Sequence, residues 1–409
     1  MRTIPHSEQI IIVGGGIAGL GTAAELSKAG LPVIVLEATT LGARASTHNQ
    51  GRLHSGGIFA CADLELARTC WQSAQRTIRD FPQCLEHGRK SQPTGMYFVS
   101  SKVGTVMAKW RKAWEQAGIP FKAVTRDEFF RDVPNVNKEL IQHVYLLPDR
   151  AFRPEVLLEH LAALARNAGA EIRTNTKVAE LLIADGAVHG VKTAAGETLA
   201  AGHVILSTGS VLNELIPRHR QFEHGQPAFE RVNLKTHLVA IRPDISHMPF
   251  TFVDWHELNH IPHMQTSVFH SGRWLPTKDG NDTQIDVHEM NQLWNEIQTL
   301  FPRLDRTALN YRREWAATAT QAMTVEQVFP GAPHPAVVNH GANGGPQRLW
   351  SASTGRLTLW PVVAEELRRE ILSHQTRGPL TASSPPWGLS PEKLENPNVS
   401  KSETKSKSL

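Results

Sequence analysis

The feature that most constrains the fold of this chain lies in residues 10–37. An apolar run at residues 10–13 is followed by Gly14, Gly16 and Gly19, then by a helical segment and a second apolar run that ends at Glu37. A strand, a glycine turn, a helix and a second strand in this order hold a dinucleotide. Gly14 permits the tight turn, Gly16 lets backbone N–H groups approach the pyrophosphate, and Gly19 lets the helix pack closely on the strand.

Two further properties of this unit indicate the kind of nucleotide. The helix N-terminus carries partial positive charge, which favours phosphate groups. Glu37 lies near the spacing of about 20 residues at which a carboxylate accepts hydrogen bonds from the adenosine ribose. A carboxylate there repels a 2′-phosphate, so the phosphorylated nicotinamide cofactor is disfavoured.

Composition limits the class of protein. The 409 residues allow two domains or one large α/β unit, and 40% hydrophobic residues are ordinary for a globular chain. A net charge of +4 without a basic block interleaved with aromatic residues gives no indication of a nucleic-acid partner.

The cysteines and the apolar runs bear on the compartment. Cys61, Cys70 and Cys84 form no Cys-x-x-Cys pair, which disfavours an iron–sulfur cluster or a redox dithiol. No stretch approaches about 18 apolar residues, and residues 1–7 are too polar for a signal peptide. We expect a cytoplasmic protein, with peripheral membrane contact left open.

Hydrophobic periodicity and turn residues predict the other elements. Residues 144–154, rich in turn formers, mark a crossing between domains, and residues 231–287 read as an antiparallel sheet on the substrate side. Strands are predicted at 95–100, 171–173, 178–183, 188–193 and 201–209, and helices at 63–86, 102–117, 154–167, 289–300 and 361–372.

Three separated segments carry a more specific signal: residues 14–37, 48–57 and 351–358. Together they resemble the D-amino-acid-oxidase-like (DAO) superfamily of FAD-dependent oxidoreductases, nearest its glycerol-3-phosphate dehydrogenase and L-2-hydroxyglutarate dehydrogenase branches. The resemblance covers about residues 8–373. Many flavin and nicotinamide enzymes share the first segment, whereas the Asn, Gly and His residues of the second are more specific.

The resemblance implies an α/β fold, with a Rossmann-like FAD-binding domain and a discontinuous substrate domain of α+β type built on an antiparallel sheet. We expect the FAD-binding domain at 1–87, 153–219 and 331–375, and the substrate domain at 88–152 and 220–330. Residues 376–409, rich in Pro, Ser and Lys, are expected to be a disordered tail.

The resemblance also implies where FAD lies. The second segment follows the isoalloxazine ring, and small residues at Gly51, Ser55, Gly56 and Gly57 suit a backbone that passes close to the flavin. The strand ending at Thr208 and Gly209 lies beside the pyrophosphate. The implied cofactor contacts are Gly14, Gly16, Ile17, Ala18, Gly19, Glu37, Ala45, Ser46, Thr47, Asn49, Gly51, Leu53, His54, Val178, Thr208, Gly209, Gly355, Arg356, Leu357 and Thr358.

The expected chemistry is hydride transfer to flavin N5 from a C–H bond that also carries a hydroxyl or amine. His54 is the candidate base because an unperturbed imidazole titrates near pH 6.5; alternatively it only hydrogen-bonds the backbone or the flavin. Arg356, in a segment that resembles a Gly-Lys-Leu-Thr stretch near the pyrimidine edge, would stabilise negative charge at N1 and the C2 oxygen; alternatively it is a surface arginine. His48 is a packing residue, a flavin contact or a covalent attachment site.

The sequence departs from the family at two places. Ile58 and Phe59 stand where glycerol phosphate enzymes usually carry an Arg-Tyr pair, and if Trp315 is the family's matching tryptophan, Ala319 occupies the position of the substrate-binding arginine. Both losses count against phosphate or carboxylate substrates, which need charge-assisted hydrogen bonds when desolvated. Three other arginines could supply the charge: Arg52, Arg273 and Arg348.

His256 to His260 match the His-Glu-x-x-His zinc pattern, which requires a helix. The preceding residues are strand-like and Pro262 follows, so no metal site is predicted. The histidines of this region are expected on strands or loops of the substrate side, where one or two face the ligand: His256, His260, His263 and His270. His237 and Arg231 are similar candidates.

With one dinucleotide fingerprint in the chain, electrons from the small-molecule substrate are expected to leave to oxygen, a quinone or a protein carrier. Three alternatives stay open: an amino acid or amine oxidase of the same superfamily, an FAD-dependent monooxygenase, and a non-catalytic flavoprotein subunit.

Overall fold

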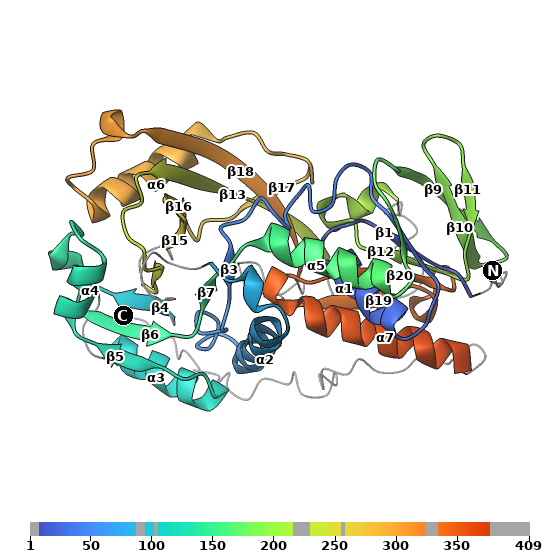
Figure 1. Cartoon of the computed structure of the whole chain (residues 1–409), viewed down its shortest axis with the longest axis horizontal. Helices are drawn as coiled ribbons and strands as arrows, with labels where there is room; N and C mark the ends of the chain where they lie inside the picture. The colour runs from blue at the N-terminus through green and yellow to red at the C-terminus, as the bar shows by residue number, and fades with distance from the viewer. Residues whose placement is uncertain are drawn as a thin grey trace, which may run out of the picture.

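Two large β-sheets organise the molecule (Figure 1). The structure is a computed structural model, and it describes residues 8–86, 95–101, 105–215, 230–254, 258–323 and 334–376. The predicted tail lies, apart from its first residue, outside the described residues.

The first sheet contains the dinucleotide-type unit. Its six strands lie in the order β19 (Ala336–Asn339), β20 (Leu349–Ser353), β12 (His203–Leu206), β1 (Ile10–Val13), β2 (Val33–Leu36) and β8 (Glu171–Arg173). All neighbours are parallel except β19 and β20. The strand predicted at 201–209 therefore does return to the nucleotide sheet, as β12.

This sheet is covered on both faces, which explains why β1 is apolar at every position. Ile10 and Ile12 pack against a helical layer, whereas Ile11 and Val13 pack against a small second sheet. The helical layer consists of α1 (Ile17–Lys28), α5 (Pro154–Asn167) and α7 (Trp360–Thr376). The small antiparallel sheet consists of β9 (Val178–Ala184), β10 (Ala187–Thr193) and β11 (Thr198–Ala200).

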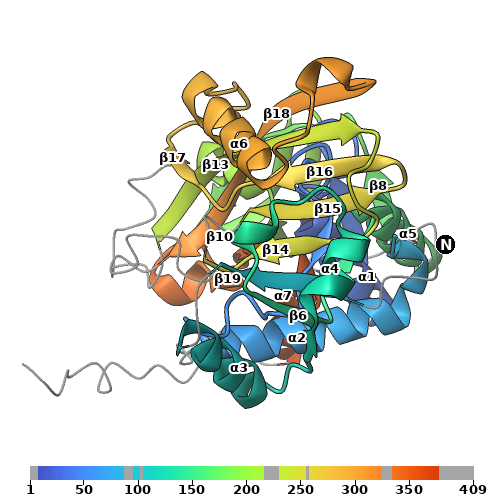
Figure 2. The same ribbon diagram turned by 90° about the vertical axis from the view of Figure 1, so that its left-hand side faces the viewer.

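The second large sheet has nine strands. It lies at the left of Figure 1, the side that faces the viewer in Figure 2. Its described pairs are antiparallel except β14 with β4. The strands are β17 (Leu275–Thr277), β13 (Glu230–Arg242), β16 (Thr266–His270), β15 (Asn259–His263), β14 (Phe250–Phe252), β4 (Met96–Ser100), β6 (His143–Leu147) and β5 (Lys122–Val124), with β18 (Tyr311–Met323) paired along β13.

Helix α6 (Val287–Leu300) covers this sheet through Leu293, Trp294 and Ile297, and α4 (Arg126–Asp132) adds Phe129 to the same core. Helices α2 (Leu64–Asp80) and α3 (Thr105–Ala117) share a further core with β4. A two-stranded sheet, β3 (Arg52–Leu53) with β7 (Arg150–Ala151), lies between the large sheets. The strands of the two large sheets fall within the two sets of ranges suggested by the sequence, and the domain division stays a proposal.

One predicted helix was too long. The helix expected at 63–86 ends at Asp80, because Phe81 has non-helical φ and ψ values of −137° and 53° and precedes Pro82. A residue before proline is disfavoured in the helical region, so the chain leaves the helix there. The start of the helix predicted at 102–117 lies outside the described residues.

Two buried histidines predict how stability depends on pH. Burial lowers the pKa of His260 and of His270 to about 3 each. The folded state keeps both neutral while the unfolded state protonates them below about pH 6.5, so stability is complete above that pH and falls as the pH falls. We expect each to remove about 2 kcal/mol of unfolding free energy between about pH 7.5 and about pH 5, measured by denaturant titration.

The control is His260→Gln. It should be less stable at neutral pH, because His260 bonds Met248 O and Ser267 Oγ at 3.2 and 2.8 Å, but lose about 2 kcal/mol less on acidification. An acid loss identical to that of the unaltered protein would contradict the assignment.

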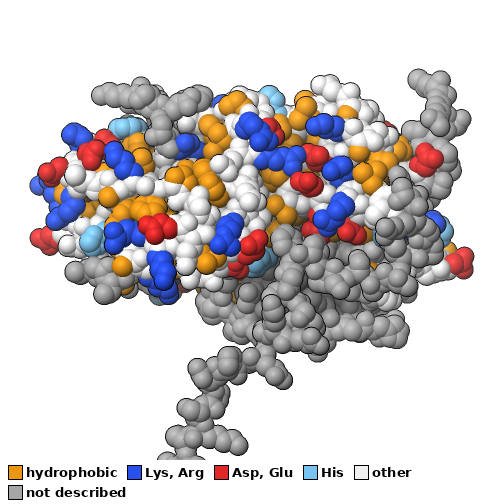
Figure 3. Space-filling view, turned by 90° about the horizontal axis from the view of Figure 1, so that it is seen from below, with side chains coloured by type: hydrophobic (Ala, Val, Ile, Leu, Met, Phe, Trp, Pro, Cys, Tyr) orange, Lys and Arg blue, Asp and Glu red, His pale blue; other side chains and the backbone are white. Residues whose placement is uncertain are grey.

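Among the helices of the described ranges, none has the length and apolarity needed to cross a bilayer. On the face shown in Figure 3, Lys and Arg side chains are interspersed with Asp and Glu.

Candidate functional site

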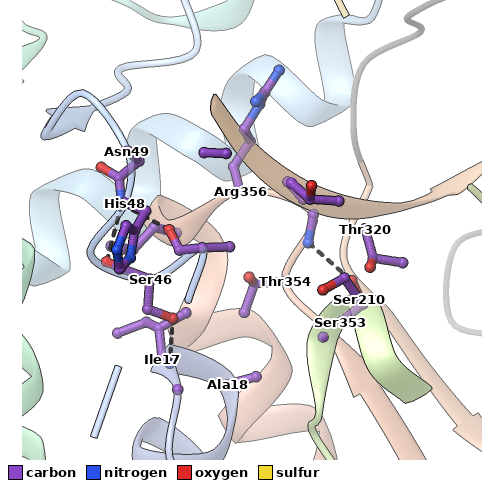
Figure 4. A pocket seen from close by; sticks show the side chains of 18 of the residues that line it. Ile17, Ala18, Ser46, His48, Asn49, Ser210, Thr320, Ser353, Thr354 and Arg356 are labelled. Carbon is purple, nitrogen blue, oxygen red and sulfur yellow. Dashed lines mark hydrogen bonds between the residues drawn. The ribbon is translucent and has the colours of Figure 1, made fainter. Parts of the chain in front are cut away.

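A cleft of about 1100 Å³, part of it open to solvent, lies between the two large sheets. One wall comes from the start of α1, residues 45–50 and residues 352–357, and the other from β13, β16 and β18. In Figure 4, Ile17 and Ala18 lie at one end of the cleft and Arg356 at the other.

The α1 end presents hydrogen-bond donors to the cleft. Gly16 caps the helix without a side-chain hydrogen bond, and the Ser46 hydroxyl accepts from Ile17 N–H at 3.1 Å. The other N–H groups of the first turn have no acceptor within the helix, and the first turn carries no acidic residue. The buried Thr208 hydroxyl next to this end has no hydrogen-bond partner among the described residues. Hydrogen-bond donors beside the partial positive charge of a helix N-terminus suit the oxygen atoms of a pyrophosphate.

The opposite end gathers cations and aromatic rings. The Arg356 guanidinium lies 5.1 Å from the centroid of the Trp274 ring and 5.9 Å from that of Phe59. His54 packs its ring 5.5 Å from Phe59, and its backbone N–H donates to Thr358 Oγ1 at 3.0 Å. Phe59, one of the two departures from the family pattern, therefore contacts both predicted catalytic residues.

A buried polar chain lies behind this end. Arg52 Nε donates to Asp149 Oδ1 at 2.9 Å, and Arg52 Nη1 donates to Asn259 Oδ1. Asn259 Nδ2 lies 3.4 Å from His270 Nδ1, and His270 Nε2 lies 3.0 Å from the Thr236 hydroxyl. Strands β3, β13, β15 and β16 thus hold one connected network at the cleft.

Two arginines act on the imidazoles at this end. Burial, followed by repulsion from Arg52 and Arg356, lowers the pKa of His54 well below its usual value. Burial, followed by repulsion from Arg356 and Arg52, lowers the pKa of His270 to about 3. Both imidazoles are therefore neutral near pH 7, and the positive charge at this end of the cleft lies on the guanidinium groups.

The structure brings eleven of the predicted site residues to the cleft and leaves nine off its lining. Those that line it are Gly16, Ile17, Ala18, Ala45, Ser46, Asn49, His54, Gly209, Gly355, Arg356 and Leu357. Those that do not are Gly14, Gly19, Glu37, Thr47, Gly51, Leu53, Val178, Thr208 and Thr358. Glu37 instead accepts from Gly15 N–H at 2.7 Å and from Thr39 N–H at 2.9 Å. Their contacts with FAD stay predictions.

The small residues of segment 48–57 have a reason that the sequence did not indicate. A Cβ at Gly51 would lie 2.6 Å from Phe152 O, one at Gly56 2.3 Å from Ala67 O, and one at Gly57 2.3 Å from Leu147 Cδ2. The Ser55 hydroxyl donates to Asp149. The protein's own packing therefore requires small residues here.

The three arginines proposed as substitute anion donors differ in their positions and partners. Arg52 lines the cleft, but it lies in an ion pair with Asp149. Arg273 is held by Glu289 and Glu296 of α6. Arg348 is exposed and directly precedes β20. The glycine turn follows the C-terminal end of β1, and the two strands run in the same direction in the sheet. Arg348 therefore lies at the N-terminal ends of these strands, away from the glycine turn. Ala319, the position of the family's arginine if Trp315 is the matching tryptophan, lines the cleft.

Within the His-Glu-x-x-His segment, His260 lies on strand β15 rather than on a helix. His256 and Glu257 lie outside the described residues. Of the histidines expected near the ligand, His270 lines the cleft, whereas His263 Nε2 lies 2.9 Å from Gln50 O. His48, given three possible roles above, also lines the cleft. His237 accepts from Asp286 N–H at 2.9 Å. The side chain of Arg231 is not among those described.

Sequence reasoning missed several residues at this end. Asp149, Asn259 and Trp274 were not singled out, and Thr236 lies in the middle of the long β13. Asp149 belongs to the segment 144–154 that was read as turns; the signal available was its place at the predicted crossing between domains.

A loop between β17 and α6 joins the two walls. The Ser210 hydroxyl donates to Gly280 O at 2.7 Å, and the next residue, Asn281, accepts from Arg44 Nη1. Ser210 lines one side of the cleft, and Ser46, two residues after Arg44, lines the other (Figure 4). Residues 280 and 281 therefore bridge the cleft beside its α1 end.

Asn281→Ala should raise the rate at which FAD leaves the holoprotein about 2- to 10-fold, because a hydrogen bond from a charged donor is lost at the bridge. Stopped-flow flavin fluorescence after dilution measures that rate. Gln284→Ala, an exposed position on the same loop, is the control. Equal rates for both variants would show that the bridge does not retain the cofactor.

Comparison with the sequences of known proteins agrees with the resemblance carried by the three segments. A sequence profile of the family described as FAD dependent oxidoreductase (DAO) matches residues 9–365. One polypeptide of the anaerobic glycerol-3-phosphate dehydrogenase of Escherichia coli (strain K12) is 33% identical over 200 residues, covering 48% of this chain and 36% of that protein. The aligned part thus spans about a third of the length of such relatives.

Solved structures share the fold. L-proline dehydrogenase from P. horikoshii superposes with a TM-score of 0.73 at 19% identity, covering 90% of this chain and 94% of that one. A glycerol-3-phosphate dehydrogenase from Bacillus halodurans, complexed with FAD, gives 0.63 at 15% identity, covering 92% and 66%. The predicted fold class is confirmed.

Proposed function

The chain belongs to the family of FAD-dependent oxidoreductases, and on that premise we propose that it oxidises a C–OH or C–NH bond of a small polar substrate. The observation that carries the proposal is that His54 and Arg356 both line the cleft and both lie beside the ring of Phe59, away from the α1 N-terminus. FAD, when bound, supplies the two-electron acceptor for the hydrogen of the substrate's C–H bond.

The chain's own residues then have separate tasks. The α1 N-terminus and Ser46 would hold the pyrophosphate of FAD, and residues 48–54 and 355–357 would flank the flavin. His54 accepts the proton of the hydroxyl or ammonium group, and Arg356 compensates the negative charge that develops near the pyrimidine edge. The rings of Trp274 and Phe59 both pack near the Arg356 guanidinium group and help to position it.

The test is an anaerobic screen of the yellow holoprotein. Glycerol 3-phosphate, 2-hydroxy acids, amino acids and secondary amines are each added, and loss of the visible absorbance of FAD is followed. Bleaching by one class identifies the donor. Reduction by a nicotinamide cofactor alone would replace the proposal with the monooxygenase, and no reduction by any compound would favour a non-catalytic subunit.

With the donor identified, His54→Gln should slow FAD reduction about 10²- to 10⁴-fold with an unchanged FAD content. Because the lowered pKa keeps His54 neutral, the rate in the unaltered protein should not fall on its account between about pH 8 and about pH 6.5. Stopped-flow reduction at several pH values measures both. A variant as fast as the parent would leave His54 a structural residue.

The electron acceptor is a separate part of the proposal. Once FAD is reduced, oxygen, a soluble quinone and an artificial one-electron carrier are each mixed with the protein. The fastest recovery of the flavin absorbance identifies the class of acceptor, and oxygen as the fastest would make the protein an oxidase.

A further inference from the structure

A carboxylate is buried directly behind the candidate base. Asp149 lies on the turn between β6 and β7 and is 0% exposed. Its Oδ1 accepts from Arg52 Nε at 2.9 Å, and its Oδ2 accepts from the Ser55 hydroxyl. These contacts fix the position of the carboxylate, because Arg52 and Ser55 belong to the same segment as His54.

His54 turns one ring nitrogen toward this carboxylate. His54 Nδ1 lies 3.9 Å from Asp149 Oδ1, within ion-pair distance, and has no hydrogen-bond partner among the described residues. The other charged or titratable groups that act on the ring are Arg52, Arg356 and His270. Both arginines oppose a positive charge on His54, and Asp149 favours one.

This arrangement selects the tautomer. A neutral imidazole carries one proton, and the nitrogen that faces an anion is the better place for it, because an N–H bond is attracted to the anion whereas a lone pair is repelled. The proton therefore belongs on Nδ1. Nε2 is left with its lone pair, as a base requires.

We propose that Asp149 is a positioning residue for His54: it holds the proton on Nδ1, leaves Nε2 as the acceptor, and compensates the imidazolium when Nε2 takes a proton. This rests on the proposed function only in that His54 is the base. In the step, the proton of the substrate's O–H or N–H bond passes to Nε2, and the hydrogen of the C–H bond leaves with its electron pair to FAD.

The tautomer can be read without any substrate. In the holoprotein with ¹⁵N-labelled histidine rings, the His54 signals are assigned by their loss in His54→Gln. We expect an Nδ1–H and a proton-free Nε2 in the unaltered protein. A proton on Nε2 would overturn the proposal at once, and this result needs no variant at Asp149.

Asp149→Asn supplies the second reading. It should increase the share of the Nε2–H form and, with an identified donor, slow FAD reduction about 10- to 100-fold while the FAD content is unchanged. If the unpaired Arg52 prevents folding, Asp149→Asn combined with Arg52→Met restores the charge balance and keeps the tautomer measurement. An unchanged tautomer in the variant that folds would overturn the role of Asp149.

The control removes an ion pair elsewhere. Arg76→Met with Glu25→Gln breaks a pair between α1 and α2 and should leave the His54 signals unchanged. The outcomes also separate the two proposals. If no donor reduces FAD but Nδ1 carries the proton, the proposed function fails, whereas the effect of Asp149 on the His54 tautomer stands. If donors reduce FAD but Nε2 carries the proton, the proposed function stands and the role of Asp149 fails.

Discussion

Arg356→Met is expected to slow reduction of the bound FAD about 10²- to 10³-fold, the usual cost of removing one donor from a site of developing negative charge. The midpoint potential of the bound FAD should fall by about 30–60 mV, equivalent to about 1.4–2.8 kcal/mol for a two-electron couple. The reason is the positive charge that Arg356 places at this end of the cleft, which the substitution removes. Stopped-flow reduction and potentiometric titration measure the two effects.

Arg356→Lys and Arg348→Met complete the comparison. The lysine variant keeps the charge and should retain most of the potential, whereas its weaker fit between Trp274 and Phe59 lowers the rate. Arg348 is exposed and off the cleft lining, so its loss should change neither quantity. A potential that stays constant in Arg356→Met would return this arginine to a structural role.

Gly19→Ala should abolish FAD retention. A Cβ at this position would lie 1.9 Å from Gly14 O and 2.8 Å from Ser207 Oγ, so α1 must move away from β1. The displaced element is the one whose N-terminus faces the cleft. The flavin-to-protein absorbance ratio of the purified variant and FAD titration of the apoprotein measure the loss.

Lys28→Ala, at the exposed end of the same helix, is the matched control and should bind FAD as the parent does. Thermal unfolding of both apoproteins shows how far the helix displacement also lowers stability. If Gly19→Ala is purified with a full complement of FAD, close packing of α1 on β1 is not required for FAD binding at the α1 end of the cleft.

The nucleotide end could be predicted because its signal is local. Residues 10–37 form β1, α1 and β2 as expected, since the turn, the helix and both strands are encoded by neighbouring residues. Of the second segment, residues 48–57, Asn49 and His54 line the cleft, and the course of this segment along the flavin stays a prediction. In both stretches, residues that are close in the sequence are also close in space.

The substrate end could not be predicted in the same way. Asp149 and Asn259 meet Arg52 only because β7 pairs with β3 and because β15 lies against β7. Such pairings between distant segments are set by strand register, which single residues do not encode. The small residues at 51–57 show the same limit: their necessity depends on Phe152 and Leu147, about 100 residues away.

The residues that line the cleft run from Gly16 to Leu357, so the first and last of them are separated by most of the chain. A ribosome that adds about 5–20 residues per second needs on the order of tens of seconds to supply the second after the first. The nascent chain therefore displays the glycine turn long before it can close around a flavin. The cleft is consequently complete only after the ribosome has added Leu357, so its full set of lining residues is available to a cofactor only at that stage of synthesis.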